Sequence, residues 1–501
     1  MVTQEIDWIF IVKKRLSWLS EMLQAKGTGK QYFQDSLGVN FEYRNARMIL
    51  FYEYLDAQEL QAFDDMVTAE LRNDSHSLHN IAQRSYQNCE RFASLGEELA
   101  KEDWSKKTND QLLQSLDSFH QQALLMIPVV YFEPNISDSI RLGLQALLKT
   151  RNEEEKLDDY FLLLTSTTKE LTVIKEQRDL LGIGALIQEQ PALVKTIFAS
   201  SPEECIHKLP VEIQAKLNQH IKDYAWINTD DIFGYPWTEV DLLMRLKHLL
   251  HKDCKSRLQI AQARQIQRES LRERLISSLP IDGELLTLVE IAGENSHLRT
   301  HRTEVYVRTL YQASSMFDEI AKHIGLSHQD ILYLSIDELR EGLTSVLPVS
   351  PNVLEQRKDG MAYVMVNREL QVFFGEDAHK LADEIQIFEE PPSQPTELEG
   401  SVANMGIVRG IVRVIHDISE LGKVEDGDIL VASMTTPEFV PAMERAAAFI
   451  TDEGGITCHA AIISREMDVP CIIGLEIATK VLKDGDFVEV DANNGIIRKL
   501  Q

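Results

Sequence analysis

Glycine is unevenly distributed along this chain of 501 residues, and the distribution strongly constrains the architecture. Fourteen of the 24 glycines lie in residues 1–399, and ten lie in the last 102 residues. Glycine serves the tight turns between short strands, whereas it weakens the interior of a helix. The distribution therefore predicts a long glycine-poor region, followed from about residue 395 by a domain of a different architecture.

The long region, residues 1–345, places apolar residues at helical spacing, for example in Asp110–Met126 and Glu239–Ala263. Helix breakers are sparse and fall between such runs, and Ser201-Pro202-Glu203 has the composition of a helix start. We predict a mostly α-helical N-terminal region over residues 1–345, in two subdomains that divide near residue 200.

Residues 346–388 are predicted to hold a connecting helix and a β-hairpin. Ala362–Phe374 alternates apolar and polar residues around Asn367-Arg368-Glu369, and a short helix is expected at Asp377–Glu384. Three prolines within residues 389–397 then predict an exposed, semi-rigid linker.

Residues 398–501 are predicted to form an α/β (β/β/α) domain, so that the chain as a whole is multidomain. Runs rich in valine and isoleucine alternate there with glycine turns and two helical patterns. The expected strands are Gly406–Ile415, Asp428–Ala432, Ala447–Thr451, Val469–Ile473 and Asp486–Val490, and the expected helices are Pro437–Arg445 and His459–Met467.

Charge and cysteine content restrict the partners and the compartment. The chain carries 51 basic and 79 acidic side chains, and a net charge of −28 repels phosphate backbones and anionic lipids. We expect neither nucleic acid nor a membrane as a partner. The five cysteines are scattered and odd in number, and the sequence shows no signal peptide and no apolar span of ~20 residues. We therefore expect a cytoplasmic protein.

The segment Thr451–Glu466 reads as a strand, a glycine loop and a helix. Gly454 and Gly455 permit backbone angles and close approaches that other residues rarely allow, and Thr457 is a suitable N-cap. His459 then falls in the first helical turn, beside amide groups that lack helical partners and at the positive end of the helix dipole. This environment favours a neutral, nucleophilic imidazole and stabilises a phosphoryl group once the imidazole carries one. Cys458 is expected to pack as a small side chain under the loop.

The sequence of Gly427–Gly474, with T-D-E-G-G-I-T-C-H-A-A-I-I, resembles the swivelling phosphohistidine domain of phosphoenolpyruvate-utilising enzymes. The resemblance implies that an ATP-grasp kinase phosphorylates His459 and that the domain then swings to a second site. The chain departs from the family pattern at Met405-Gly406 and at Glu438-Phe439, away from the nucleophile. The residues expected to support the phosphate are Thr457, Gly454, Gly455, Thr435, Thr436 and Arg465; a helix-face ion pair is the alternative for Arg465.

The rest of the sequence shows neither the Gly-rich phosphate loop of an ATP-grasp kinase nor a phosphoenolpyruvate-binding barrel. Glu304–Leu339 is similar to the segment ahead of the swivelling domain in rifampicin phosphotransferase, where a helical domain holds the acceptor. These resemblances imply that ATP and Mg²⁺ bind to a separate ATP-grasp kinase subunit, and we expect no cofactor in this chain. The implied acceptor is a small molecule, or a substrate of the phosphoenolpyruvate or pyruvate type.

Aromatic residues of the helical region are candidates for an acceptor pocket, because such pockets are rich in aromatic side chains. The candidates are Trp226, Tyr235 and Trp237, with Arg302 and Arg308 (and the neighbouring Arg299) as clamps for an anion. The alternatives are core packing for the aromatic residues and an exposed helix face for the arginines. His248, His251 and Cys254 could start a metal site, but a solvated helix face is favoured, so that no metal is predicted.

Two functions remain open from the sequence. The first is a phosphotransferase component that carries a phosphoryl group on His459 from the kinase partner to an acceptor near the helical region. The second is a non-catalytic regulatory or protein-interaction subunit that phosphorylation of His459 switches.

Overall fold

The computed structural model describes residues 6–13, 16–73, 77–132, 136–167, 169–229, 235–281, 283–345, 349–384, 395, 397–455 and 458–500. The chain folds into two compact units that are each assembled from separate segments. Unit 1 comprises Met1–Gly143, Thr229–Gly234 and Asp282–Glu389, and unit 2 comprises Leu144–Asn228, Tyr235–Ile281 and Glu390–Gln501. Residue 200, where we expected a division, lies inside unit 2.

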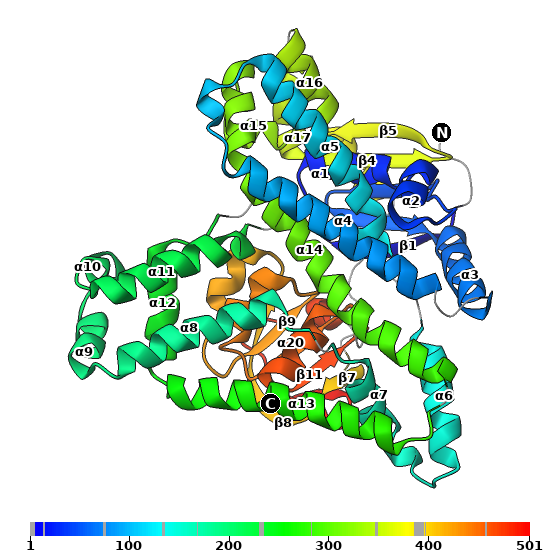
Figure 1. Cartoon of the computed structure of the whole chain (residues 1–501), viewed down its shortest axis with the longest axis vertical. Helices are drawn as coiled ribbons and strands as arrows, with labels where there is room; N and C mark the ends of the chain where they lie inside the picture. Colours follow the sequence, from blue (N-terminus) through cyan, green and yellow to red (C-terminus); the bar gives the residue numbers. More distant parts are fainter. Residues whose placement is uncertain are drawn as a thin grey trace. The chain divides into compact units, whose positions relative to one another are not determined.

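Unit 1 combines an antiparallel sheet of five strands, in the order β1-β3-β2-β4-β5, with a set of helices (Figure 1). The strands are β1 (Trp8–Lys13), β2 (Ala46–Ile49), β3 (Tyr52–Asp56), β4 (Met361–Val366) and β5 (Glu369–Phe374). The helices are α1 (Trp18–Gly27), α2 (Lys30–Leu37), α3 (Ala57–Asn73), α4 (Ser77–Leu99), α5 (Asn109–Tyr131), α14 (Gly283–Ile324), α15 (His328–Ile331), α16 (Ile336–Thr344), α17 (Pro351–Asp359) and α18 (Glu376–Glu384).

The N-terminal region is mostly α-helical, as predicted, but the sheet of unit 1 adds strands that were not predicted there. Strands β1–β3 lie within residues 8–56, and β2 pairs with β4 so that Ala46 is opposite Met365. These strands are only four to six residues long, which leaves no alternating pattern long enough to detect. Strand β2 also pairs with a strand about 300 positions away. The hairpin predicted around Asn367 is confirmed, because β4 and β5 pair directly, with Val366 opposite Glu369.

Unit 2 begins with a set of helices, α7–α13, which we call the helical block. Helix α6 (Ser137–Lys149) crosses the division between the units. The members of the helical block are α7 (Leu157–Thr165), α8 (Thr172–Gln188), α9 (Pro191–Ala199), α10 (Pro202–Ile206), α11 (Val211–Tyr224), α12 (Glu239–Leu249) and α13 (Cys254–Ser278), with a 3₁₀ turn η3 (Ala225–Asn228).

The helical spacing over Glu239–Ala263 does not correspond to one helix, because the chain breaks between α12 and α13. Asp253 caps α13 by accepting a hydrogen bond from the backbone N–H of Ser256 at 3.0 Å. An N-cap aspartate stabilises a new helix start and so competes with continuation of the preceding helix.

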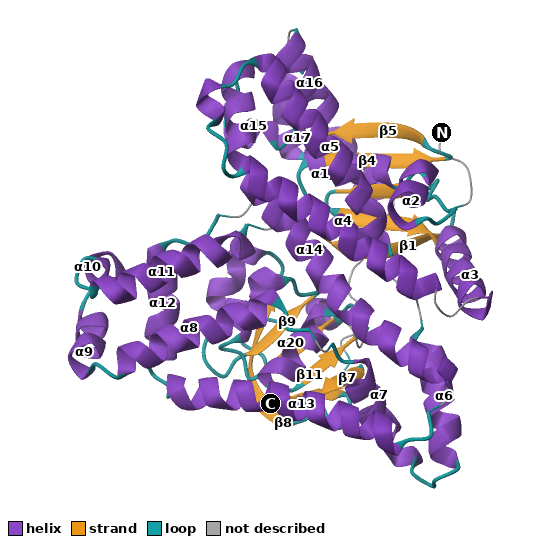
Figure 2. Ribbon diagram, in the orientation of Figure 1, coloured by secondary structure: helices purple, strands orange, loops and turns teal. Residues whose placement is uncertain are grey.

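The C-terminal domain of unit 2, residues 397–500, contains an eight-stranded sheet in the order β6-β13-β12-β8-β9-β10-β11-β7, and Figure 2 shows its strands in orange. Strands β8–β11 run parallel to one another, and the others pair antiparallel. The strands are β6 (Glu397–Glu399), β7 (Ser401–Asn404), β8 (Ile407–Ile415), β9 (Ile429–Ala432), β10 (Ala448–Thr451), β11 (Cys471–Ile473), β12 (Phe487–Asp491) and β13 (Ile496–Lys499).

Short helices connect the strands of the C-terminal domain: η4 (Ile418–Lys423), η5 (Pro437–Phe439), α19 (Val440–Met443), α20 (His459–Met467) and α21 (Ala478–Val481). Buried valine, isoleucine and leucine side chains from β8, β9, β10 and β12 fill the core of the domain. All five predicted strands and the helix His459–Met467 are confirmed to within about two residues. The predicted linker, residues 389–397, falls almost entirely outside the described residues.

Among the described residues, no helix is both long enough and apolar enough to cross a membrane.

Candidate functional site

His459 is the first residue of α20, as predicted, and therefore lies at the amino end of that helix. The N-cap is Cys458 rather than Thr457, because the Cys458 side chain accepts a hydrogen bond from the backbone N–H of Ala461 at 3.5 Å. Thr457 itself lies outside the described residues, so its predicted role in phosphate support stays a prediction.

The glycine loop before α20 lies against this cap. Gly454 has a φ of +111°, and a Cβ atom there would lie 2.8 Å from the Cys458 sulfur, so glycine meets both a conformational and a steric requirement. A Cβ atom on Gly455 would meet no atom within 4 Å. Cys458 is 8% exposed, which confirms that it packs as a small side chain under the loop.

The loop after β9 supplies the side chain that contacts the imidazole. Thr435 is buried, and its Oγ1 lies 2.9 Å from Nδ1 of His459. Thr436 follows as the half-buried N-cap of η5. A hydrogen bond to one ring nitrogen fixes the orientation of the ring and the tautomer, and so decides which nitrogen carries the lone pair.

A second contact, which the sequence did not suggest, ties the loop after β9 to the glycine loop. The backbone N–H of Glu453 donates to the carbonyl of Ser433 at 2.9 Å, and the Ser433 hydroxyl hydrogen-bonds the Glu453 carboxyl group. Burial, with a contribution from nearby Asp452, raises the pKa of Glu453 to about 7. A titratable carboxyl group therefore lies one residue before Gly454.

Arg465 lies one helical turn or more beyond the nucleophile, and its Nε donates to the carbonyl of Ala461 in the same helix at 2.8 Å. Burial lowers the pKa of its guanidinium to about 10. The next residue, Glu466, forms an ion pair with Arg268 of α13. Phosphate support by Arg465 stays a prediction.

Acidic residues of the C-terminal domain meet basic residues of the helical block within unit 2. The most buried of these contacts joins Arg245 of α12 to Glu444 at 3.1 Å, and Arg245 also binds Glu176 of α8 at 2.7 Å. The basic row, as we call it, consists of Arg245, Lys252, Arg264 and Arg268, which pair with Glu444, Asp426, Asp468 and Glu466 respectively.

The candidate acceptor residues of unit 2 are packed as the core alternative predicted, with one exception. Trp226 and Trp237 are 4% and 5% exposed, and the Arg245 guanidinium lies 4.5 Å above the Trp237 ring. The indole N–H of Trp226 donates to the carbonyl of Asp223 at 2.9 Å. Tyr235 is the exception, because it is 74% exposed.

The candidate arginines belong to unit 1 and not to the unit of the tryptophans. Arg302 is buried, and its Nη1 donates to the carbonyls of Val129 and Phe132 at 2.9 and 2.7 Å. The expectation that Arg302 clamps an anionic substrate is therefore corrected: the side chain caps the carboxyl end of α5. Arg308 is exposed, as the helix-face alternative predicted.

The three residues considered for a metal site each have a separate environment. His248 lies 3.3 Å from Asp426, the His251 ring lies 4.7 Å from that of Phe198, and the Cys254 thiol donates to the carbonyl of Leu249 at 3.4 Å. In the part of the chain that the structure describes, no three histidine, cysteine or acidic side chains are arranged to hold a metal ion.

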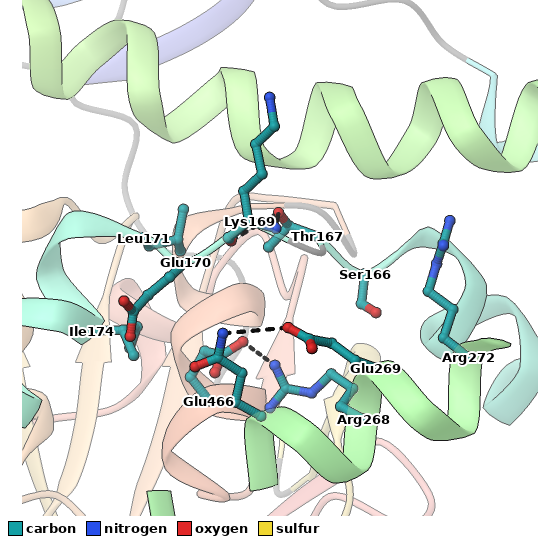
Figure 3. Close-up of a pocket in the computed structure, with 11 residues that line it drawn as sticks. Ser166, Thr167, Lys169, Glu170, Leu171, Ile174, Arg268, Glu269, Arg272 and Glu466 are labelled. Atoms are coloured by element: carbon teal, nitrogen blue, oxygen red, sulfur yellow. Dashed lines mark hydrogen bonds and ion pairs between the residues drawn. The ribbon is translucent and has the colours of Figure 1, made fainter. Parts of the chain in front are cut away.

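A hollow in unit 2 lies where the segment before α8, helix α13 and the end of α20 meet (Figure 3). Its charged groups include the Arg268–Glu466 pair, and Gln265 donates to Glu269 at 3.3 Å. Glu466 is seven residues beyond His459, which amounts to about 10 Å along a helix. The hollow is therefore separate from the surroundings of the imidazole.

Comparison with known proteins shows that the site lies in a segment that matches a known family domain. Residues 424–495, which include Thr435, Glu453 and His459, match the family model for the mobile domain of PEP-utilising enzymes. A probable phosphoenolpyruvate synthase of Archaeoglobus fulgidus is 57% identical over 113 residues, 22% of this chain and 15% of that protein. The phosphoenolpyruvate synthase of Pyrococcus furiosus is 46% identical over 143 residues, 28% of this chain and 17% of that protein.

A longer match reaches into the helical region. An uncharacterised phosphotransferase of Bacillus subtilis, YvkC, is 25% identical over 396 residues, which cover 71% of this chain and 45% of that protein. The matched region thus spans less than half the length of each of these three relatives. The resemblance to PEP-utilising enzymes that the sequence predicted is confirmed for the C-terminal domain.

Proposed function

We propose that this chain is a phosphotransferase component in which His459 carries a phosphoryl group from a separate ATP-grasp kinase to an acceptor bound near the helical region. The observation that carries the proposal is the contact of 2.9 Å between Thr435 Oγ1 and Nδ1 of His459 at the amino end of α20. This contact orients the imidazole, and the amino end of the helix where the imidazole lies is suited to binding an anion.

The contact between Thr435 and Nδ1 supports Nε2 as the nitrogen that takes the phosphoryl group in the first transfer. When Nδ1–H donates to Thr435, the lone pair of the neutral ring is on Nε2, and Nε2 attacks phosphorus. An N–P bond forms, the P–O bond to the donor breaks, and its electron pair leaves on the donor oxygen. The amide groups at the start of α20 then stabilise the new negative charge. ATP and Mg²⁺ would bind to the kinase partner, where the metal neutralises charge on the phosphates.

The second transfer reverses the chemistry. An oxygen of the acceptor attacks phosphorus, the N–P bond breaks, and its electron pair returns to the imidazole. The acceptor would be a small molecule or a substrate of the phosphoenolpyruvate or pyruvate type. The match of the Bacillus subtilis phosphotransferase over 71% of this chain supports a transferase whose helical region contributes to the reaction.

The test uses the full chain, an ATP-grasp kinase without its own phosphohistidine domain, and ATP labelled at either the β- or the γ-phosphorus. We expect acid-labile label on the wild type and on His416→Ala, a control at an exposed histidine of the same domain, and none on His459→Ala. Equal labelling of the His459→Ala variant would contradict the proposal.

A chase with unlabelled acceptor separates the two functions that the sequence left open. Rapid loss of label from the chain, with recovery of a phosphorylated small molecule, is the result expected of a transferase. Slow loss of label with every acceptor would favour a regulatory subunit switched by phosphorylation instead.

A further inference from the structure

Two loops at the carboxyl ends of β9 and β10 lie side by side next to His459. The parallel ladder of these strands ends at Thr451 opposite Ala432, and two further backbone bonds join the loops beyond it: the N–H of Asp452 donates to the carbonyl of Ala432 at 3.1 Å, and that of Glu453 donates to the carbonyl of Ser433 at 2.9 Å. The loop after β9 carries Thr435, and the loop after β10 carries the glycines.

The Glu453 side chain adds a bond across the same junction. Its carboxyl group hydrogen-bonds the Ser433 hydroxyl, and the Thr451 hydroxyl donates to the Glu453 carbonyl at 2.6 Å. Ser433 is only two residues before Thr435, the residue that contacts the ring. The carboxyl group thus holds the start of the loop on which the orientation of His459 depends.

The neighbouring acidic residue, Asp452, forms hydrogen bonds to a different part of the domain. Asp452 accepts hydrogen bonds from the backbone N–H of Thr479 at 3.1 Å and from its hydroxyl, so it fixes the end of β10 to α21. The two consecutive acids therefore have separate roles, Asp452 toward the body of the domain and Glu453 toward the loop of Thr435.

We propose that Glu453 is a positioning residue for His459, which acts through Ser433 and Thr435 to hold the imidazole in the Nδ1–H tautomer. This inference rests on the proposed function for its consequence, phosphoryl transfer through Nε2. Its structural part, the control of the ring by Glu453, is measurable without any phosphoryl donor.

The test compares the full-length variants Glu453→Leu, Ser433→Ala and Thr435→Val with the double variant Glu453→Leu/Thr435→Val. One readout is the pair of ¹⁵N chemical shifts of the His459 ring, which report the tautomer and are assigned by their absence in His459→Ala. The other is the rate at which His459 becomes phosphorylated by phosphoramidate, a small donor that needs no kinase partner and releases ammonia.

Leucine at 453 should leave a mixture of tautomers and slow phosphorylation on the order of tenfold to a hundredfold, as expected for a misplaced reacting group. Ser433→Ala removes the same bond from the other side and should have the same effect, which keeps the test open if Glu453→Leu does not fold. Glu453→Gln can restore the bond to Ser433 and should rescue both readouts. Glu420→Gln serves as a control, because Glu420 accepts from the backbone N–H of His416 at 2.9 Å, away from Thr435 and Ser433.

The double variant distinguishes positioning from general support of the fold. If Glu453 acts through Thr435, the double variant should react no more slowly than Thr435→Val alone, because the two changes remove one interaction. Rates that multiply, or a wild-type tautomer in Glu453→Leu, would overturn the inference. If His459 accepts no phosphoryl group in the wild type, the proposed function fails, and the tautomer comparison still decides the role of Glu453.

Discussion

Gly454 shows at the scale of one residue how the backbone presents His459. A positive φ of +111° and a prospective Cβ contact of 2.8 Å to the Cys458 sulfur both require glycine, and Cys458 is the cap of the helix that His459 begins. A side chain at position 454 would therefore disturb the cap as well as the loop.

We predict that Gly454→Ala destabilises the C-terminal domain by about 1–3 kcal/mol, the range for a residue forced into such a conformation. Gly455→Ala is a matched control one residue away, because its Cβ atom would meet nothing within 4 Å, and it should change stability by less than about 0.5 kcal/mol. Thermal unfolding of the two variants by calorimetry tests the difference. Equal midpoints would show that the loop tolerates a side chain at 454.

The raised pKa of Glu453 implies that the free energy of unfolding depends on pH through this residue. Burial raises this pKa to about 7 in the folded chain, above its ordinary value of about 4.3 in an unfolded chain. The folded state therefore binds more protons between these values, so the contribution of Glu453 to stability declines as the pH rises from about 4 to about 7 and is constant above that. Glutamine at position 453 cannot ionise. The free energy of unfolding of Glu453→Gln minus that of the wild type should therefore be larger at pH 8 than at pH 5.

Urea unfolding at pH 5 and pH 8 measures this difference, which we expect to be on the order of 1–3 kcal/mol, since one pKa unit corresponds to about 1.4 kcal/mol. Glu420→Gln is the control. Burial does not dominate at Glu420: its bond to Lys423 lowers the pKa of this carboxyl group. A constant difference between Glu453→Gln and the wild type at both pH values would contradict the prediction.

At the scale of elements, Arg245 joins two helices of the helical block to the C-terminal domain. Its side chain is 7% exposed and lies between the carboxylates of Glu176 and Glu444, which are 1% and 3% exposed. Although burial alone would raise the pKa of Glu176, Arg245 and His220 hold it below its ordinary value, whereas burial raises that of Glu444. The buried carboxyl groups of Glu176 and Glu444 thus share the guanidinium of Arg245 as a partner.

Arg245→Met should destabilise unit 2 by about 3–5 kcal/mol, because it leaves two buried carboxyl groups without their common cation. Arg264→Met removes a pair whose arginine is 40% exposed, and it should change the stability by no more than about 1 kcal/mol. The two midpoints of thermal unfolding give the comparison. A similar small shift for both variants would show that the buried pair contributes no more than the surface pair.

Prediction from the sequence succeeded where a pattern is local. Strands β8–β12 and helix α20 follow from runs of valine and isoleucine, glycine turns and a helical period within about 100 residues. Strands β1–β3 were missed because each is only four to six residues long, and one of the two partners of β2, strand β4, is distant in sequence. The division of α12 from α13 depends on one capping aspartate, Asp253, within a continuous apolar period.

For the candidate site too, the residues within one local motif were predictable and the long-range contacts were not. His459, Gly454 and Thr435 follow from one motif and its resemblance to a family, and the structure places Thr435 against the ring. The contact of Glu453 with Ser433 joins residues 20 positions apart whose types indicate no particular bond. Arg302 was assigned to an anion because a sequence does not reveal that its carbonyl partners are about 170 residues away.

At the scale of the whole molecule, each unit is built from segments that are distant in the sequence. Unit 2 brings the helical block together with a C-terminal domain that follows it by more than 100 residues. The ion pairs of the basic row all have the same polarity: the basic residue belongs to the helical block, and the acidic partner, such as Glu444, belongs to the C-terminal domain. The net charge of −28 hides this complementarity.

The central claim is that His459 carries a phosphoryl group, and ³¹P NMR of the full chain after reaction with phosphoramidate tests it directly. We predict a resonance of phosphorus bonded to nitrogen that appears in the wild type and in His416→Ala and is lost from His459→Ala. A resonance of equal intensity in His459→Ala would contradict the claim.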